Sequence, residues 1–541
     1  MGAAPAAPWR GAWRSCSRPR RRHRPFPRLA GTPPAPRLAT RPRPAQPSPR
    51  PPFHPQTETT QPRPKSHANQ RSLHTHAAPL HPMNILLAYS GGLDTSYLTA
   101  KLSAEGHAVT AVTVDCGGFS HSEKKAVAAR ALALGAASHR FVSAKDTLFE
   151  RVLTHLIAGN VRRGGTYPLC VAAERSIQAE LLAQLAVSDG FDALAHGCTA
   201  AGNDQVRFEA ALWTCAPELT VLAPVRDEAP SRADQRAYLE AGGHALPPAG
   251  GEYSINAGLW GLTIGGGVLL DTLEPLPEEA WLWTVPAAPA SPAAPAAPAS
   301  PAPIGPTTIS VSFKGGLPTA VDGVAMEPVE LIEYLNALAG ASGIGRGYHT
   351  GDTVLGIKGR IAFEAPAAEV LLTAHGELEK LVLTGDQRFW KDHLAELYGR
   401  RLHAGLFHDP LMRNLEALFT STQERVSGTV MLQVHGAGLL VTGIDTPHSM
   451  LAASDARYGE RPAAAADPRA AVGLARTMAE PARLFAAAAA PAPEPTNVLS
   501  FPAPAPTQVA TGVEPQKQNA AVSQIATASP VIEAAMTGSC G

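Results

Sequence analysis

Hydrophobic residues between positions 84 and 197 fall into short runs that are separated by longer amphipathic stretches. The runs expected to form buried strands are 84–89, 108–115, 139–144 and 191–197. The stretches with apolar residues at helical spacing are 95–106, 122–135, 145–159 and 174–190. Strands that alternate with helices of this length predict a parallel sheet with helices on both faces, which is a Rossmann-like α/β fold.

Further along the chain, the pattern predicts two helices and a hairpin. Apolar residues share one face of a predicted helix at 328–340. Two apolar runs that meet at a glycine-containing turn predict a β-hairpin at 429–443. A final helical pattern follows at 467–487.

Three low-complexity segments bound and interrupt these patterns. Residues 1–82 are rich in Arg and Pro, contain one acidic residue, Glu58, and are expected to be a disordered basic extension. An Ala/Pro stretch at 286–303 predicts a semi-rigid linker, and an Ala/Pro-rich tail is expected at 488–541. The organised parts are a first domain at 83–250, a second domain at 251–466 and a helix at 467–487.

The basic extension has three interpretations. Its lack of acids fits a transit peptide, but its prolines oppose the amphipathic helix that such peptides form. A nucleic-acid-binding arm would also be basic, although most basic tracts are only solvated. We favour the interpretation that Met83 is the true start, because the organised pattern begins there without a transition.

Composition argues against several classes of protein. The 541 residues include 46 Lys and Arg and 46 Asp and Glu, so the formal net charge of zero gives no bias toward nucleic acid or membranes. No apolar run reaches the roughly 18 residues that a membrane-spanning helix needs. The six cysteines are scattered and no secretory pattern is apparent, so a reducing cytoplasm is expected. The histidines lack metal-ligand spacing, so no metal centre built from a side-chain cluster is expected.

Four expected turns fall at the carboxyl ends of strands, where such sheets bind ligands, at 90–96, 115–118, 166–170 and 196–208. In the first, SGGLDTS, Gly91 and Gly92 allow close backbone approach. A helix is expected to begin at Thr95 and Ser96, and its free N–H groups favour phosphate. Asp94 is suited to hold a Mg²⁺ ion that neutralises the same phosphates. The turn matches neither G-x-x-x-x-G-K-[ST] nor G-x-G-x-x-G, and a tight turn without a ligand is the alternative.

The same turn resembles the pyrophosphate loop (PP-loop) of the adenylating ATP pyrophosphatases. GNDQVRFE at 202–209 resembles the argininosuccinate synthase family specifically, as does AYSGGLDTS at 88–96. The resemblance continues through 216–227, 253–261, 328–340 and 421–430, covers about 83–487 and excludes both ends. It implies an ATP-binding domain of the adenine nucleotide alpha hydrolase type, an α+β synthetase and multimerisation domain, and a C-terminal helix.

The family forms argininosuccinate from citrulline, aspartate and ATP, and releases AMP and pyrophosphate. The ureido oxygen of citrulline attacks the α-phosphate, and the aspartate amine then displaces AMP from the citrullyl-adenylate. The resemblance therefore implies an AMP-forming carbon–nitrogen ligase of arginine biosynthesis, with Mg²⁺ accompanying ATP. It also implies a cytoplasmic homotetramer that exchanges its C-terminal helices, without nucleic-acid or membrane partners.

Matching positions imply three groups of binding residues. Those for ATP are Ala88, Tyr89, Ser90, Gly91, Gly92, Leu93, Asp94, Thr95, Ser96, Val114 and Gly197. Those for aspartate are Thr199, Asn203 and Asp204, and those for citrulline are Tyr167, Asn203, Arg207, Ser254 and Thr263. No side chain is an obvious general base, so Asp94 and Arg207 are expected to affect turnover through phosphate neutralisation and positioning. For Arg207, an internal salt bridge is the alternative.

The sequence departs from the family pattern mainly on the citrulline side. The differing positions, with the usual residue in parentheses, are Ala172 (serine), Gly351 (glutamate), Phe363 (tyrosine), Gly118 (glutamine), Ala200 (glycine) and Thr263 (serine). Glu174 or Asp352 is a conjectural source of the lost polar contacts. A helix-capping role is the alternative for Glu174.

Two other functions compete with the ligase. A tRNA-thiolating enzyme would use the same turn with a reactive cysteine, for which Cys198 is the candidate. A cysteine beside a strand end is usually inert, however, and the core has no basic RNA face. A nucleotide-binding sensor would keep the fold and lack ligase activity.

Overall fold

The computed structural model describes the residues 81–247, 252–284, 307–435, 438–464 and 466–488. The predicted linker at 286–303, the basic extension up to residue 80 and the tail from residue 489 lie outside the described residues. All described residues fall within one of the two units into which the chain divides.

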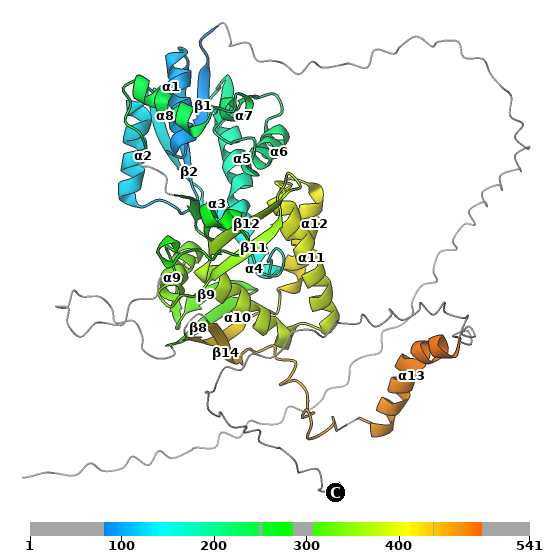
Figure 1. Cartoon of the computed structure of the whole chain (residues 1–541). Helices are drawn as coiled ribbons and strands as arrows, with labels where there is room; N and C mark the ends of the chain where they lie inside the picture. The colour runs from blue at the N-terminus through cyan, green and yellow to red at the C-terminus, as the bar shows by residue number, and fades with distance from the viewer. Residues whose placement is uncertain (1–80, 248–251, 285–306, 436–437, 465, 489–541) are drawn as a thin grey trace, which may run out of the picture. The chain divides into compact units, whose positions relative to one another are not determined.

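A five-stranded parallel sheet, of which Figure 1 labels β1 and β2, forms the first part of this unit and has the strand order β3-β2-β1-β4-β5. Its strands are β1 (Asn84–Ala88), β2 (Ala108–Asp115), β3 (Ser138–Ser143), β4 (Ala193–His196) and β5 (Thr220–Leu222). The first four strands confirm the predicted runs to within two residues at each end. The sequence pattern did not indicate β5, because three residues are too few to show a period.

Helices cover both faces of this sheet, as the alternation predicted. They include α1 (Leu93–Ala104), α2 (His121–Ala133), α5 (Ala172–Ser188), α6 (Asp204–Cys215), α7 (Pro224–Asp227) and α8 (Arg232–Ala241). Neighbouring residues of β1 point to opposite faces. Ile85 and Leu87 therefore share a buried cluster with Leu98 of α1, whereas Leu86 packs in a second cluster with Ile177 of α5.

The helix predicted at 145–159 is one helical segment with a wide central turn. It consists of α3 (Lys145–Leu148), a π-helical turn η1 (Phe149–Leu153) and α4 (Thr154–Ala158). Such a turn holds an extra residue and shifts the buried face around the helix axis. The chain then makes a short reversal in which Arg163 and Tyr167 form an isolated β-bridge.

Two antiparallel sheets, with the orders β10-β9-β8-β13-β14 and β11-β12-β7-β6, form the second part. Their strands are β6 (Tyr253–Gly258), β7 (Gly261–Gly266), β8 (Thr307–Lys314), β9 (Leu317–Val321), β10 (Val324–Ala325), β11 (Arg346–Asp352), β12 (Lys358–Glu364), β13 (Gly428–His435) and β14 (Gly438–Asp445). The helices are η2 (Gly267–Leu270), η3 (Glu278–Ala280), α9 (Pro328–Gly340), α10 (Pro366–Val382), α11 (Gly385–His403), α12 (Pro410–Thr422) and α13 (Pro468–Ala487). The predicted helix at 328–340, the hairpin and the final helix are confirmed as α9, β13–β14 and α13; the hairpin's turn residues 436–437 lie outside the described residues.

Helix α13 carries large apolar side chains that are open to solvent. Leu474, Met478 and Phe485 are 61, 72 and 84 % exposed. Their spacings of four and seven residues place them on one side of the helix. No described helix, α13 included, is both long and apolar enough to cross a membrane.

The strand order of the parallel sheet reverses at β1, which pairs with β2 on one side and with β4 on the other. Open parallel sheets bind ligands in the crevice beyond the carboxyl ends of the strands at such a reversal. The turns that follow β1, β2 and β4 meet there.

Candidate active site

A cavity of about 1010 Å³ lies beyond these strand ends and is lined by residues from both parts of the molecule. The lining includes most of the residues that the sequence had indicated, namely Ala88, Tyr89, Ser90, Gly92, Asp94, Thr95, Val114, Tyr167, Gly197, Thr199, Asn203, Asp204, Arg207, Ser254 and Thr263. Gly91, Leu93 and Ser96 are not among the lining residues. The structure thus brings together residues that are far apart in the sequence.

The glycine turn after β1 is held in an open conformation by its neighbours. Gly91 has φ +78°, and a Cβ there would lie 3.0 Å from Cγ2 of Val127, so the position suits glycine. Its carbonyl oxygen accepts a hydrogen bond from Nη1 of Arg130 at 2.9 Å. Helix α1 begins at Leu93, two residues before the expected Thr95, with Gly92 as an N-cap that has no side chain. The first amides of α1 therefore keep their capacity to bind an anion.

Asp94 lies in the first turn of α1 and lines the cavity. Its Oδ1 accepts a hydrogen bond from Nε2 of Gln235 at 2.9 Å. Gln235 belongs to α8 and is buried, so it fixes the carboxylate without neutralising its charge. A carboxylate oxygen beside a phosphate-binding turn is the kind of ligand that Mg²⁺ accepts together with substrate phosphates.

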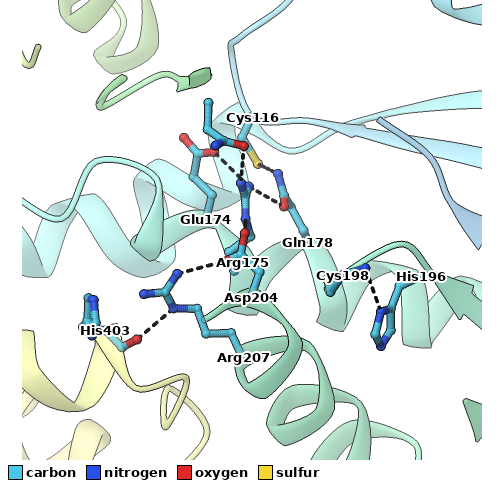
Figure 2. Close-up of polar contacts among 10 residues, drawn as sticks. Cys116, Glu174, Arg175, Gln178, His196, Cys198, Asp204, Arg207 and His403 are labelled. Carbon is cyan, nitrogen blue, oxygen red and sulfur yellow. Dashed lines mark hydrogen bonds and ion pairs between the residues drawn. The ribbon is translucent and has the colours of Figure 1, made fainter. Parts of the chain in front are cut away.

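Asp204 is the centre of an ion-pair network in the cavity wall (Figure 2). Its Oδ1 accepts from Nη1 of Arg207 at 2.7 Å, and its Oδ2 accepts from Nε of Arg175 at 2.9 Å. Burial tends to raise the pKa of Asp204, but Arg175 and Arg207 outweigh this effect and lower the pKa to about 2. Arg207 is itself buried and donates from Nε to the carbonyl oxygen of His403 at 2.8 Å. The internal salt bridge considered for Arg207 is therefore present, within the cavity wall.

Arg175 also lines the cavity, although sequence reasoning did not select it. Besides Asp204, it donates to Oε1 of Gln178 at 3.0 Å and to Oδ1 of Asn256 at 3.1 Å (Figure 2). Asp204 and Glu174 raise the pKa of Arg175 further, against the effect of burial. The only sequence signal was its place in the stretch AER, next to the altered Ala172.

A second group, of which sequence reasoning had named only Asp352, surrounds Arg163. Nη1 of Arg163 lies 3.2 Å from Nε2 of His349 and 3.1 Å from Nε2 of His403, and Nη2 donates to the carbonyl oxygen of Asp352. All four residues line the cavity. They come from the reversal after α4, from β11 and from the end of α11, so no local motif connects them.

Most positions that depart from the family pattern lie at the cavity, although Ala200 is not among its lining residues. Ala172, Gly351 and Gly118 line the cavity, whereas Phe363 packs behind it with its ring 5.3 Å from that of Tyr167. A Cβ at Gly351 would lie 2.9 Å from Nε2 of His349, so the imidazole occupies the space next to this glycine.

Glu174 does not line the cavity, so it is not in a position to replace the lost polar contacts from there. It lies in the first turn of α5 and is almost fully buried, and its Oε1 has no hydrogen-bond partner among the described residues. Burial raises the pKa of Glu174 to about 8. Asp352 does line the cavity, but its carboxylate pairs with Lys358 at 2.6 Å.

The thiols and histidines elsewhere give little support for other chemistry. Burial, followed by Asp204, raises the pKa of Cys198 to about 12, so its thiol is protonated at neutral pH. Outside the cavity, Glu180, Cys215 and His408 have potential metal-ligand atoms within 4.8 Å of one another. The spacing of these residues in the sequence did not indicate this group. Arg151 already pairs with the Glu180 carboxylate, and its charge opposes a cation there.

Family models match both parts of the chain. The model described as the arginosuccinate synthase N-terminal HUP domain matches residues 84–245, and the model of the arginosuccinate synthase C-terminal domain matches residues 253–485.

Three relatives illustrate the similarity to curated proteins. The argininosuccinate synthase of Methanocaldococcus jannaschii is 37 % identical over 377 residues, which are 70 % of this chain and 92 % of the relative. That of Xylella fastidiosa is 36 % identical over 68 % of this chain and 88 % of the relative. That of Methanothermobacter thermautotrophicus is 35 % identical over 74 % of this chain and 96 % of the relative. Given these matches and the site above, the chain belongs to the argininosuccinate synthase family of ATP-dependent ligases.

Proposed function

We propose that the cavity joins citrulline to aspartate at the expense of ATP, through a citrullyl-adenylate, as in the family's role in arginine biosynthesis. The observation that carries this proposal is the shared lining: one cavity contains the glycine turn, the GNDQVRFE segment and residues from β6 and β7. ATP, citrulline and aspartate can therefore meet in one place, which the two-step reaction needs.

ATP would bind with its β- and γ-phosphates over the glycine turn, at the first amides of α1. The remaining oxygen of Asp94 would hold Mg²⁺, because Gln235 engages only Oδ1. When bound, the ion supplies charge neutralisation at the phosphates. Val114, the last residue but one of β2, and Gly197, which follows β4, would lie against the nucleoside.

The ion-pair network would exchange partners when the amino acids bind. Asp204 stays ionised at neutral pH, because its pKa is about 2, and it is suited to pair with the ammonium group of aspartate. Arg207 would then turn its Nη1 from Asp204 to the carboxylate of citrulline. Thr199 and Asn203 would complete the aspartate site, and Tyr167, Ser254 and Thr263 the citrulline site.

The two rival functions have less support. A thiolating enzyme needs a nucleophilic thiolate, and the raised pKa of Cys198 opposes one. A sensor without ligase activity would need no pocket beside the nucleotide, whereas this cavity extends to Ser254, Thr263 and the arginines.

We also propose that the chain forms a homotetramer in the cytoplasm, with no nucleic-acid or membrane partner. The exposed apolar side of α13 supports assembly, because a second copy could cover it. The cysteines at positions 116, 170, 198 and 215 are free, which suits a reducing compartment.

Pyrophosphate release tests this function. Wild-type protein should release pyrophosphate from ATP only with citrulline, and should form AMP and argininosuccinate only when aspartate is also present. Asp94→Ala should reduce citrulline-dependent release at least about 100-fold, since it removes a charged group at the developing phosphate charge. Asp189→Ala, which loses a surface pair with Arg140 and a hydrogen bond from Ser188, is the matched control and should keep full activity.

Release that needs tRNA in place of citrulline would support the thiolating enzyme. No release with any of these substrates, from protein that still binds ATP, would support the sensor. Undiminished release by Asp94→Ala would remove the proposed magnesium role but not the ligase.

A further inference from the structure

Arg163 places a positive charge in the cavity wall without a carboxylate to neutralise it. Its guanidinium contacts two imidazoles and one backbone carbonyl, and it forms no ion pair with any described residue. An arginine in a partly buried site usually pairs with an anion, because desolvating its charge is unfavourable. The missing counter-ion points to a ligand.

The two imidazoles do not add charge of their own at neutral pH. Burial, followed by Arg207 and Arg163, lowers the pKa of His403 to about 3. Burial and Arg163 likewise lower the pKa of His349. Both rings are therefore neutral acceptors that hold Nη1 of Arg163 in place, and the cation keeps its full charge.

Arg163 and Arg207 approach the same place from two elements. His403 connects them, since its ring contacts Arg163 and its carbonyl oxygen accepts from Nε of Arg207 at 2.8 Å. Burial lowers the pKa of Arg163 and Arg207 adds to this effect, as expected when two like charges lie close together; Glu396 and Asp352 oppose it without forming an ion pair with the guanidinium. Two guanidinium groups held by one residue, Arg163 by its neutral ring and Arg207 by its carbonyl oxygen, form a site for an oxyanion.

No described carboxylate in the lining is left to bind the α-ammonium group of the ureido substrate on this wall, because Asp204 is assigned to the ammonium group of aspartate. The carboxylates that line the cavity are Asp94, Glu123, Asp204 and Asp352. Asp94 and Glu123 belong to the nucleotide side, on α1 and α2. Asp204 is shared between two arginines and Asp352 pairs with Lys358. At the position beside His349 the chain has Gly351, which has no side chain at all.

We propose that Arg163 and Arg207 together bind the carboxylate of the ureido substrate, and that its α-ammonium group is not required for recognition. This inference rests on the proposed function and specifies its substrate class: ω-ureido carboxylic acids, with or without an α-amino group. Arg163 is then the residue that selects the acid, and the imidazoles of His349 and His403 position it.

The test combines three ureido compounds with variants of two neighbouring arginines. The compounds are citrulline, 5-ureidopentanoate, which lacks the amino group, and 4-ureidobutylamine, which lacks the carboxylate. The readout is kcat/KM for ureido-dependent exchange of pyrophosphate into ATP, which reports the adenylation step alone. The variants are Arg163→Gln and, as the matched control, Arg162→Gln, because Arg162 pairs with Glu369 and does not line the cavity.

Wild-type protein should use 5-ureidopentanoate within about tenfold of citrulline and reject 4-ureidobutylamine by at least about 100-fold, since only the latter leaves the arginines unpaired. Arg163→Gln should lower kcat/KM for both acids by about 10- to 100-fold and leave that for the amine unchanged. Arg162→Gln should match wild type with all three compounds. The KM for ATP should stay constant in both variants, which excludes general misfolding.

Two outcomes would overturn the inference while the proposed function stands. If Arg163→Gln lowers kcat/KM equally for all three compounds, Arg163 only stabilises the cavity wall and does not recognise the carboxylate. Rejection of 5-ureidopentanoate as strong as that of the amine would mean that the ammonium group is recognised after all. A wild-type protein that binds ATP but uses no ureido compound would instead contradict the proposed function itself, and this inference with it.

Discussion

Glu174 is an acid in a place that disfavours its charge. The side chain is about 1 % exposed, and a Cβ at Gly258 would lie only 1.5 Å from its Oε1, so the two residues fit together only because position 258 is glycine. Burial, with Asp115 and Asp204 adding to it and Arg175 opposing it, raises the pKa of Glu174 from 4.5 to about 8. The folded protein therefore binds a proton here that the unfolded chain releases.

Replacing Glu174 by Gln should make stability less dependent on pH. Below pH 4.5 the Glu174 carboxyl is protonated in both the folded and the unfolded state, so it does not change the free energy of unfolding. Between pH 4.5 and about 8 the carboxyl ionises only in the unfolded chain, so the free energy of unfolding of the wild type falls as the pH rises. At pH 8.5 the variant should be more stable by several kcal/mol, at ~1.4 kcal/mol per pKa unit. Urea unfolding at pH 5, 6.5 and 8.5 measures this difference. The exposed Glu240→Gln should give no such trend, and a Glu174→Gln curve parallel to that of the wild type would refute the raised pKa.

At the residue scale, the sequence could indicate those site residues that lie in continuous motifs. Asp94 follows two glycines after a strand, and Asp204 and Arg207 lie in one short stretch, so each can be recognised from the residues next to it in the sequence. Arg163 could not be selected in this way. The proposed role of Arg163 depends on His349 and His403, whose ring nitrogens lie within 3.2 Å of its Nη1 only in the folded protein.

At the element scale, prediction succeeded where a period was long enough to be read. Four strands of the parallel sheet, α9 and the hairpin were confirmed. Strand β5 has only three residues, which are too few to show a hydrophobic period. The π-turn inside 145–159 has the apolar composition of an α-helix but a different number of residues per turn, so composition could not reveal it. The roles of Ser254 and Thr263, which belong to the second part of the molecule, rested on resemblance, because pairing between distant strands has no local sequence pattern.

Helix α13 should be an assembly element. Replacing Leu474, Met478 and Phe485 together by Ser removes its exposed apolar side, and the particle mass in solution should fall to that of a smaller assembly. Light scattering at several protein concentrations measures the change. The control, Arg476→Ser with Glu480→Ser, alters the opposite side of the helix and should leave the mass unchanged. A wild-type chain that is already monomeric would contradict the proposed tetramer.

At the scale of the whole molecule, one hydrophobic core joins the two parts. A single buried cluster contains Leu86 and Val112 of the parallel sheet together with Val311 and Leu371 of the second part. Trp260 is fully buried and donates from Nε1 to the carbonyl oxygen of Pro168 at 2.9 Å, which ties the two parts by a hydrogen bond as well.

This shared core should make unfolding cooperative. Urea titrations followed by far-UV circular dichroism and by tryptophan fluorescence should give coincident transitions, because neither part can open without exposing the common cluster. Trp260→Phe should shift both transitions to lower urea by the same amount, since it removes a buried hydrogen bond and packing volume. Two separated transitions would show that the parts are independent.

The residues that form the cavity are synthesised at different times. A ribosome makes the glycine turn early and His403 more than three hundred residues later, yet the carbonyl oxygen of His403 holds the Arg207 side chain and its ring holds that of Arg163. The segment that carries the nucleotide turn is therefore complete long before the residue that holds the arginines of the amino-acid pocket. Because the two parts share one core, the amino-acid pocket can be finished only after α11 has left the ribosome.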